Sequence, residues 1–244
     1  MNSIRSESPQ TSGPRTNRPQ PVASLTHTLV LTGIFVALAA GGAYMQGRGG
    51  SGGAITPRHP ATLSLYLSVM VGEWALVYYV WSALRRRGIP LRELIGGEWR
   101  GTRQVLRDIA IAAGFWVVFK GTVWACAHLL GSGGAKSIST LLPEGPVEAV
   151  AWVALSVSAG FCEELVFRGY LLRQIWAWSG SPIVAVILQA IVFGIGHGYQ
   201  GTSATITILV LGVEFALLAW WRRSLRPGMV AHAWADIFGG LIGR

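Results

Sequence analysis

Long apolar runs separated by short polar stretches dominate the chain. Residues 25–44 form the first run, and about 20 apolar residues are enough for a helix to cross a hydrocarbon core of ~30 Å. By the same criterion the later runs predict six further membrane helices, at 63–84, 109–130, 147–168, 183–197, 204–221 and 229–242. The fifth and seventh runs are short, which suits helices that border an internal cavity. We therefore predict an all-α, polytopic membrane helix bundle of about seven transmembrane helices (six to eight), with a catalytic cavity in the C-terminal half.

Polar segments divide the chain into three parts. Residues 1–22 are rich in Ser, Pro, Thr, Asn and Arg, a composition that predicts a disordered cytoplasmic tail. Residues 23–146 hold the first three membrane helices and a basic connector at 88–107, which is a candidate interfacial helix. Residues 147–244 hold the remaining helices. The pattern permits the fourth helix to continue to Trp178, where Ser-Gly-Ser-Pro breaks it.

Composition supports a membrane protein. The chain is 51% hydrophobic and 13% charged, whereas soluble domains average about 25% charged residues. The lipid bilayer is therefore an expected partner. The net charge of +9 would favour a nucleic-acid partner in a soluble protein, but here the basic residues gather in polar segments between spans, so we expect no nucleic acid. Their distribution places the N-terminus in the cytoplasm of a plasma or inner membrane.

Charged and titratable groups interrupt the apolar helices at three places in the C-terminal half. They are Glu163 and Glu164 with Arg168, then His197 after Phe193, and finally His232 with Asp236. An ionisable residue at mid-bilayer costs roughly 2.5–3.5 kcal/mol, so each is a functional-site hypothesis. Residues four apart share a helix face, which predicts an ion pair between Glu164 and Arg168. Glu163 lies about 100° round the helix and is left free to act as a general base.

The predicted topology conflicts with a single site. It puts Glu163 near the cytoplasmic end of span four and His197 near the outer end of span five. A bend or a tilt of span five, which Gly194 and Gly196 before the histidine would permit, is the expected resolution. The alternative for every one of these groups is an interhelix polar contact. The same alternative applies to three further intramembrane charges, with the first two as a candidate buried pair: Glu73, Lys120 and Glu214.

The order E-E-x-x-x-R, F-x-x-x-H and H-x-x-x-N/D resembles the CPBP family, intramembrane glutamic endopeptidases that include CAAX proteases and bacteriocin-processing or self-immunity proteins. The resemblance covers roughly residues 147–240. It implies that Glu163 and His197 activate a water for attack on a peptide carbonyl, and that His232 and the residue at Asp236 stabilise the oxyanion. It implies supporting roles for Glu164, Arg168 and Phe193. The eukaryotic CAAX proteases have Asn where this chain has Asp236, so we expect Asp236 to orient His232 instead.

The expected function is an intramembrane endopeptidase that acts on a membrane or membrane-associated peptide or protein, with no cofactor. One alternative is a Zn²⁺-dependent form with Glu163, His197 and His232 as ligands, although the chain has no H-E-x-x-H motif. Another class of alternative is non-enzymatic: an immunity protein, or a proton-coupled transporter with Glu73 and Glu214 in its relay. The absence of repeated halves in the sequence argues against a transporter.

Overall fold

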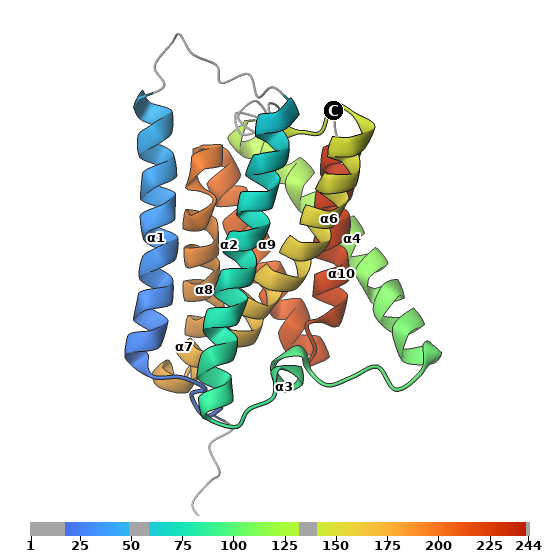
Figure 1. The fold of residues 1–244 in the computed structure, drawn as a ribbon. Helices are drawn as coiled ribbons and strands as arrows, with labels where there is room; N and C mark the ends of the chain where they lie inside the picture. The colour runs from blue at the N-terminus through green and yellow to red at the C-terminus, as the bar shows by residue number, and fades with distance from the viewer. Residues whose placement is uncertain (1–17, 49–58, 132–140, 243–244) are drawn as a thin grey trace, which may run out of the picture.

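The computed structural model describes residues 18–48, 59–131 and 141–242, and these fold into a helix bundle (Figure 1). The elements are α1 (Leu25–Arg48), α2 (His59–Arg86), α3 (Leu91–Ile95), α4 (Thr102–Leu130), α6 (Pro146–Glu163), the π-helix η2 (Glu164–Leu171), α7 (Leu172–Ser179), α8 (Pro182–Gly196), the 3-10 turn η3 (Gly198–Gln200), α9 (Thr202–Arg222) and α10 (Arg226–Leu241). The prediction of an all-helical fold is confirmed.

Four helical segments in the described part are long and apolar enough to cross a membrane, namely 62–86, 102–130, 146–179 and 202–222. Residues 25–41 and 182–196 form shorter apolar helices. These findings support a multi-pass membrane protein, while the count of seven crossings stays a prediction. The connector is shorter than predicted, because α4 begins at Thr102 and only the five residues of α3 are helical before it.

The N-terminal segment lies against α7. Arg18 donates hydrogen bonds to the carbonyl oxygens of Ala177 and Trp178, and the Val22 amide donates to Gln174 Oε1 at 2.6 Å. Val22 is fully buried. Residues 18–22, which the composition assigned to the tail, therefore pack on the bundle. The rest of the predicted tail, residues 1–17, lies outside the described residues.

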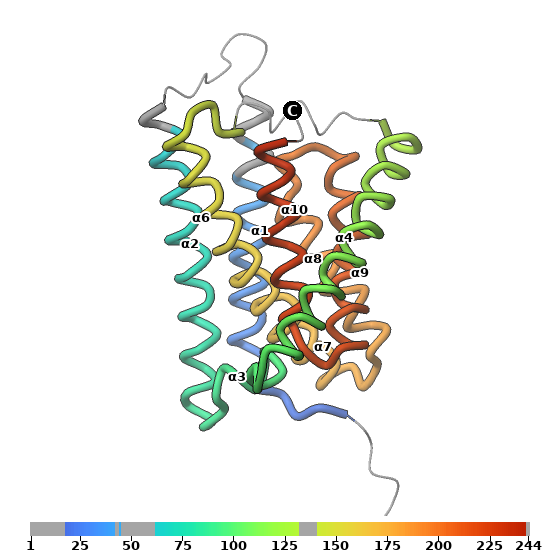
Figure 2. Tube along the Cα trace, turned by 90° about the vertical axis from the view of Figure 1, so that its right-hand side faces the viewer, coloured from blue at the N-terminus to red at the C-terminus, as the bar shows by residue number. Residues whose placement is uncertain are grey.

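Helix α6 packs against α2 on one side and against α10 on the other (Figures 1 and 2). Its contact with α10 is close because Gly160 has no side chain: a Cβ there would lie 2.8 Å from both the Met229 carbonyl oxygen and the Ala233 amide nitrogen. At the other end of this antiparallel contact, Gly240 faces the Trp152 ring. Small residues allow membrane helices to approach in this way, and the approach brings α10 side chains to the end of α6.

The helix that carries the acidic pair continues without a break from Pro146 to Ser179, through α6, η2 and α7. Helix α8 then returns antiparallel, after a turn in which Gly180 has a φ of 71° and Ser181 caps the new helix. Glu163 lies 16 residues before Ser179, and His197 lies 15 residues after Pro182. The two arms of this hairpin therefore have similar length, and their upper ends reach similar depth.

This geometry removes the conflict in the predicted topology. The fourth span was predicted to end near Arg168, with a continuation of the helix to Trp178 permitted, and the end at Arg168 put Glu163 near the cytoplasmic side. Since the helix extends through α7, Glu163 lies well inside the bundle. Span five was predicted to bend or tilt, and α8 is one regular α-helix up to Gly196, so no break in it is needed to bring His197 to the level of Glu163. The helical segment from Glu163 to Ser179 is nearly as long as the segment from Pro182 to His197, and this match in length brings Glu163 and His197 to a similar depth.

Candidate active site

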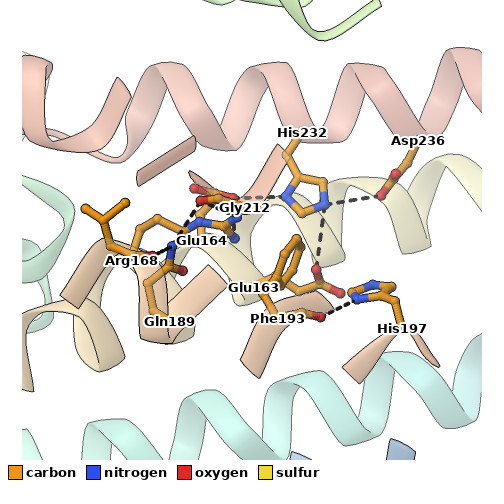
Figure 3. A network of polar contacts seen from close by, with 10 residues as sticks. Glu163, Glu164, Arg168, Gln189, Phe193, His197, Gly212, His232 and Asp236 are labelled. Atoms are coloured by element: carbon orange, nitrogen blue, oxygen red, sulfur yellow. Dashed lines mark hydrogen bonds and ion pairs between the residues drawn. The ribbon is translucent and has the colours of Figure 1, made fainter. Parts of the chain in front are cut away.

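The acidic pair lies where the backbone changes from α to π geometry. Glu163 is the last residue of α6 and Glu164 the first of η2. π-helical turns are rare and occur frequently at functional sites. All eight residues of η2 are buried. The two carboxylates thus leave a tightly enclosed segment in different directions, toward the groups drawn in Figure 3.

Glu164 and Arg168 form the predicted ion pair. Arg168 Nη1 lies 3.0 Å from Glu164 Oε1, and neither side chain is exposed. The guanidinium also lies over the rings of Phe193 and Phe215, 4.2 and 5.2 Å from their centroids. Such contacts add cation–π stabilisation to the ion pair. The predicted supporting residue Phe193 therefore forms one wall of the arginine's pocket.

His232 reaches this pair from α10. Its Nδ1 lies 3.1 Å from Glu164 Oε1, and because a carboxylate paired with arginine accepts hydrogen bonds, Nδ1 is the donor. Its Nε2 lies 3.7 Å from Glu163 Oε2 and 3.7 Å from Asp236 Oδ2, which is longer than a hydrogen bond. The short contact that holds the ring is therefore with Glu164, and not with Asp236, which we had expected to orient it.

Glu163 differs from its neighbour in exposure and in bonding. Its side chain is 22% exposed, whereas that of Glu164 is 0% exposed. Glu163 Oε2 is itself buried and makes no hydrogen bond to any described residue. Buried carboxylate oxygens nearly always have a hydrogen-bond partner. This oxygen therefore retains full capacity to accept a proton or a hydrogen bond from a molecule in the site.

His197 closes the site from the end of α8. Its Nδ1 lies 2.9 Å from the Phe193 carbonyl oxygen, and since a carbonyl only accepts, Nδ1 must carry the proton. The neutral ring therefore presents the lone pair of Nε2. In Figure 3 the His197 ring lies beside the Glu163 carboxylate, and the Phe193 ring contacts both histidines, with centroids 4.8 and 6.3 Å apart. Four of the predicted residues, Glu163, His197, His232 and Asp236, thus surround one space.

One further carboxylate near the site is missed by the family pattern. Glu73 on α2 accepts a hydrogen bond from Ser158 Oγ at 2.8 Å, and Ser158 lies on α6 five residues before Glu163. The predicted pair of Glu73 with Lys120 was wrong, since Lys120 Nζ lies over the Trp116 ring. A glutamate in the middle of an apolar run was the available signal, but nothing in the sequence indicated its partner.

Two other features complete the surroundings. Tyr199 follows His197 in η3, with the two ring centroids 6.3 Å apart, and burial raises the pKa of its hydroxyl. Glu214 on α9 accepts a hydrogen bond from Thr122 at 2.6 Å, away from the acidic pair. Within the described ranges, no group of three His, Cys, Asp or Glu side chains is arranged to hold a metal ion.

Comparison with known proteins places this arrangement in context. Residues 143–238 match the model of a family described as type II CAAX prenyl endopeptidase Rce1-like. The matched segment begins just before α6 and ends within α10, so it contains every residue drawn in the site. No curated protein and no solved structure matched the sequence.

Proposed function

Residues 143–238 form an Rce1-like CAAX prenyl endopeptidase domain, a family of membrane proteases, and from this premise we propose that the protein is an intramembrane endopeptidase in which Glu163 and His197 activate the attacking water. The observation that carries the proposal is the buried Glu163 Oε2, which has no hydrogen-bond partner in the described part of the chain. A general base needs such an oxygen within reach of the proton that it removes.

In the first step, a water donates one hydrogen bond to Glu163 and the other to His197 Nε2. The hydrogen bond of His197 Nδ1 to the Phe193 carbonyl fixes the ring in the tautomer that this step requires. As the water oxygen attacks the peptide carbonyl carbon, its proton passes to Glu163. The exposure of Glu163 on one side gives the substrate a path to the carboxylate.

In the second step, the tetrahedral oxyanion needs donors that are already in position. His232 supplies one from Nε2 when both ring nitrogens carry protons. Its Nδ1 proton is held by Glu164, and Arg168 in turn holds Glu164 through the ion pair. The ion pair of Glu164 and Arg168, which was predicted to have a supporting role, therefore also holds His232, the oxyanion donor. Asp236, whose Oδ2 lies 3.7 Å from Nε2, stabilises the doubly protonated ring electrostatically.

Collapse of the intermediate returns the proton from Glu163 to the departing amine nitrogen. The C–N bond breaks, a carboxylic acid and an amine are released, and Glu163 is ionised again. Each proton is accounted for without a covalent enzyme intermediate, and the thiol beside the acidic pair in the sequence, Cys162, is buried with Ser158 Oγ 3.8 Å from its sulfur.

The test is cleavage by purified protein in liposomes. Quenched fluorescent reporters would span the membrane, or would carry a C-terminal CAAX tetrapeptide with and without a prenylated cysteine. We expect Glu163→Gln to lower kcat by about 10²- to 10⁴-fold, while Glu214→Gln, the matched change of an intramembrane carboxyl away from the site, leaves it intact. Equal activity of the wild type and Glu163→Gln, or no cleavage of any reporter, would refute the proposal.

Two additional measurements separate the alternatives. Loss of cleavage on treatment with a zinc chelator, with recovery on added Zn²⁺, would replace the metal-free mechanism by the zinc-dependent one. Proton uptake driven by a solute gradient, with no cleavage and with equal sensitivity to Glu163→Gln and Glu214→Gln, would identify a transporter.

A further inference from the structure

A second polar cluster lies at the end of the bundle opposite the C-terminus, where α4 begins and α9 turns into α10 (Figures 1 and 2). Asp108 is completely buried there and accepts a hydrogen bond from Trp99 Nε1 at 2.9 Å. Three arginines surround its carboxylate: Arg107 and Arg222 at 3.5 and 3.6 Å from Oδ1, and Arg226 at 3.3 Å from Oδ2. One negative charge thus faces three positive ones.

The arginines keep hydrogen-bonding capacity that Asp108 does not use. Arg222 Nε and Arg226 Nη1 are buried and have no hydrogen-bond partner in the described part of the chain. Arg107 is half exposed and Arg222 is 18% exposed, so the cluster opens toward the surface at these two residues. An excess of guanidinium groups with unused donors is suited to a phosphate, which accepts paired N–H bonds.

An apolar groove starts directly beside this cluster. Helices α4 and α9 border an open groove of about 520 Å³ between them. Its walls are Ile111, Gly114, Phe115, Val118, Leu217, Leu218 and Trp221, with Glu214 at one edge. Ile111 lies one turn along α4 from Arg107, and Leu218 lies one turn along α9 from Arg222. The groove therefore runs into the bundle from the two arginines that open to the surface.

Arg107 and Arg222 lie at one end of the groove and apolar side chains line the rest of it. This arrangement suits a molecule with an anionic head group and a hydrocarbon chain. We propose that this site binds an anionic phospholipid, with its phosphate on Arg107 and Arg222 and an acyl chain between α4 and α9. Basic pockets between membrane helices bind anionic head groups, and here Asp108 fixes two arginines by sharing one oxygen between them. The site is separate from the acidic pair and is independent of the proposed peptidase reaction.

The test is native mass spectrometry of the delipidated protein in detergent, titrated with dioleoylphosphatidylglycerol or dioleoylphosphatidylcholine. We expect one phosphatidylglycerol to bind about fivefold or more tightly than phosphatidylcholine, because phosphatidylcholine carries the same phosphate but its choline cation leaves it without net negative charge. The double variant Arg107→Gln/Arg222→Gln should lose this preference. The control Arg85→Gln/Arg86→Gln removes two charges from the same end of the bundle, at the end of α2, and should keep it.

A second variant tests the groove without touching the charges. A Cβ at Gly114 would meet nothing within 4 Å, so Gly114→Leu fills the groove instead of disturbing the helix contact. It should weaken binding of both lipids, while glycerol 3-phosphate, which has no acyl chain, should bind wild type and Gly114→Leu alike. Binding of glycerol 3-phosphate as tightly as the lipid would show a free-phosphate site.

Three results would overturn the proposal. The first is equal affinity of the wild type for the two lipids. The second is an equal loss of preference in the control Arg85→Gln/Arg86→Gln. The third is a dimer that carries no bound lipid and is abolished by Gly114→Leu, which would identify a second copy of the chain as the occupant of the groove.

Discussion

Removal of either partner of the buried ion pair between Glu164 and Arg168 should be costly, and the two losses should not add. At the N–O distance of 3.0 Å, two unit charges attract by about 5 kcal/mol at an effective dielectric constant of about 20. Arg168→Met leaves Glu164 with His232 as its main partner, and we expect a loss of about 3–5 kcal/mol. Glu164→Gln leaves the arginine unpaired at similar cost. The double variant should lose about 2 kcal/mol less than the sum of the single losses.

The measurement is a double-mutant cycle from unfolding by SDS in mixed micelles, followed by tryptophan fluorescence. The control cycle uses Arg92 and Glu98, an ion pair of 3.3 Å whose side chains are 67% and 68% exposed. Exposed pairs contribute about 0–1 kcal/mol, so this cycle should give a small coupling energy. A coupling energy for the buried pair no larger than that of the exposed pair would refute the reasoning.

Three further predictions concern other parts of the molecule. His197→Ala should lower kcat by about 10²- to 10⁴-fold in the liposome cleavage assay without moving the unfolding midpoint; an unchanged kcat would remove it from the reaction. Gly160→Ala should destabilise the protein by roughly 1–3 kcal/mol, because its Cβ would lie 2.8 Å from the α10 backbone, whereas Gly121→Ala, with nothing within 4 Å of its Cβ, should not; the same SDS titration compares them, and equal losses contradict the packing argument. Gln174→Leu removes the amide that holds the backbone of the N-terminal segment, so the amide protons of Val22 and Ala23 should exchange with deuterium several-fold faster, and an unchanged rate would show that other contacts suffice.

Local spacing was enough to predict the part of the site that lies on one helix. Glu164 and Arg168 are four residues apart, and a helix brings such residues together whatever its neighbours do. The helical class followed from hydrophobic runs for a similar reason, because a chain in hydrocarbon must satisfy its backbone internally. These features depend on interactions between residues that are close in sequence.

Contacts between helices could not be predicted from the sequence. The hydrogen bond from His232 to Glu164 depends on how closely α10 approaches α6. Gly160 allows this close approach, and the hydrophobic pattern of the sequence does not predict it. The position of Glu73 beside Ser158 similarly depends on the crossing of α2 and α6. The depth of Glu163 was misjudged because the acidic pair looked like a helix end, although the helix passes through it in π geometry.

The segments from Glu163 to Ser179 and from Pro182 to His197 are the two arms of a hairpin. The number of residues between the turn and the end of each arm sets how far Glu163 and His197 lie from that turn. Each residue of an α-helix adds about 1.5 Å and turns the chain by about 100°. One residue inserted into α8 would therefore raise His197 past the carboxylate and rotate it out of the site, even if every side chain were kept. Lineages that carry this site should consequently vary in composition along both arms while the number of residues in each arm stays fixed, and accept insertions only beyond the hairpin's ends.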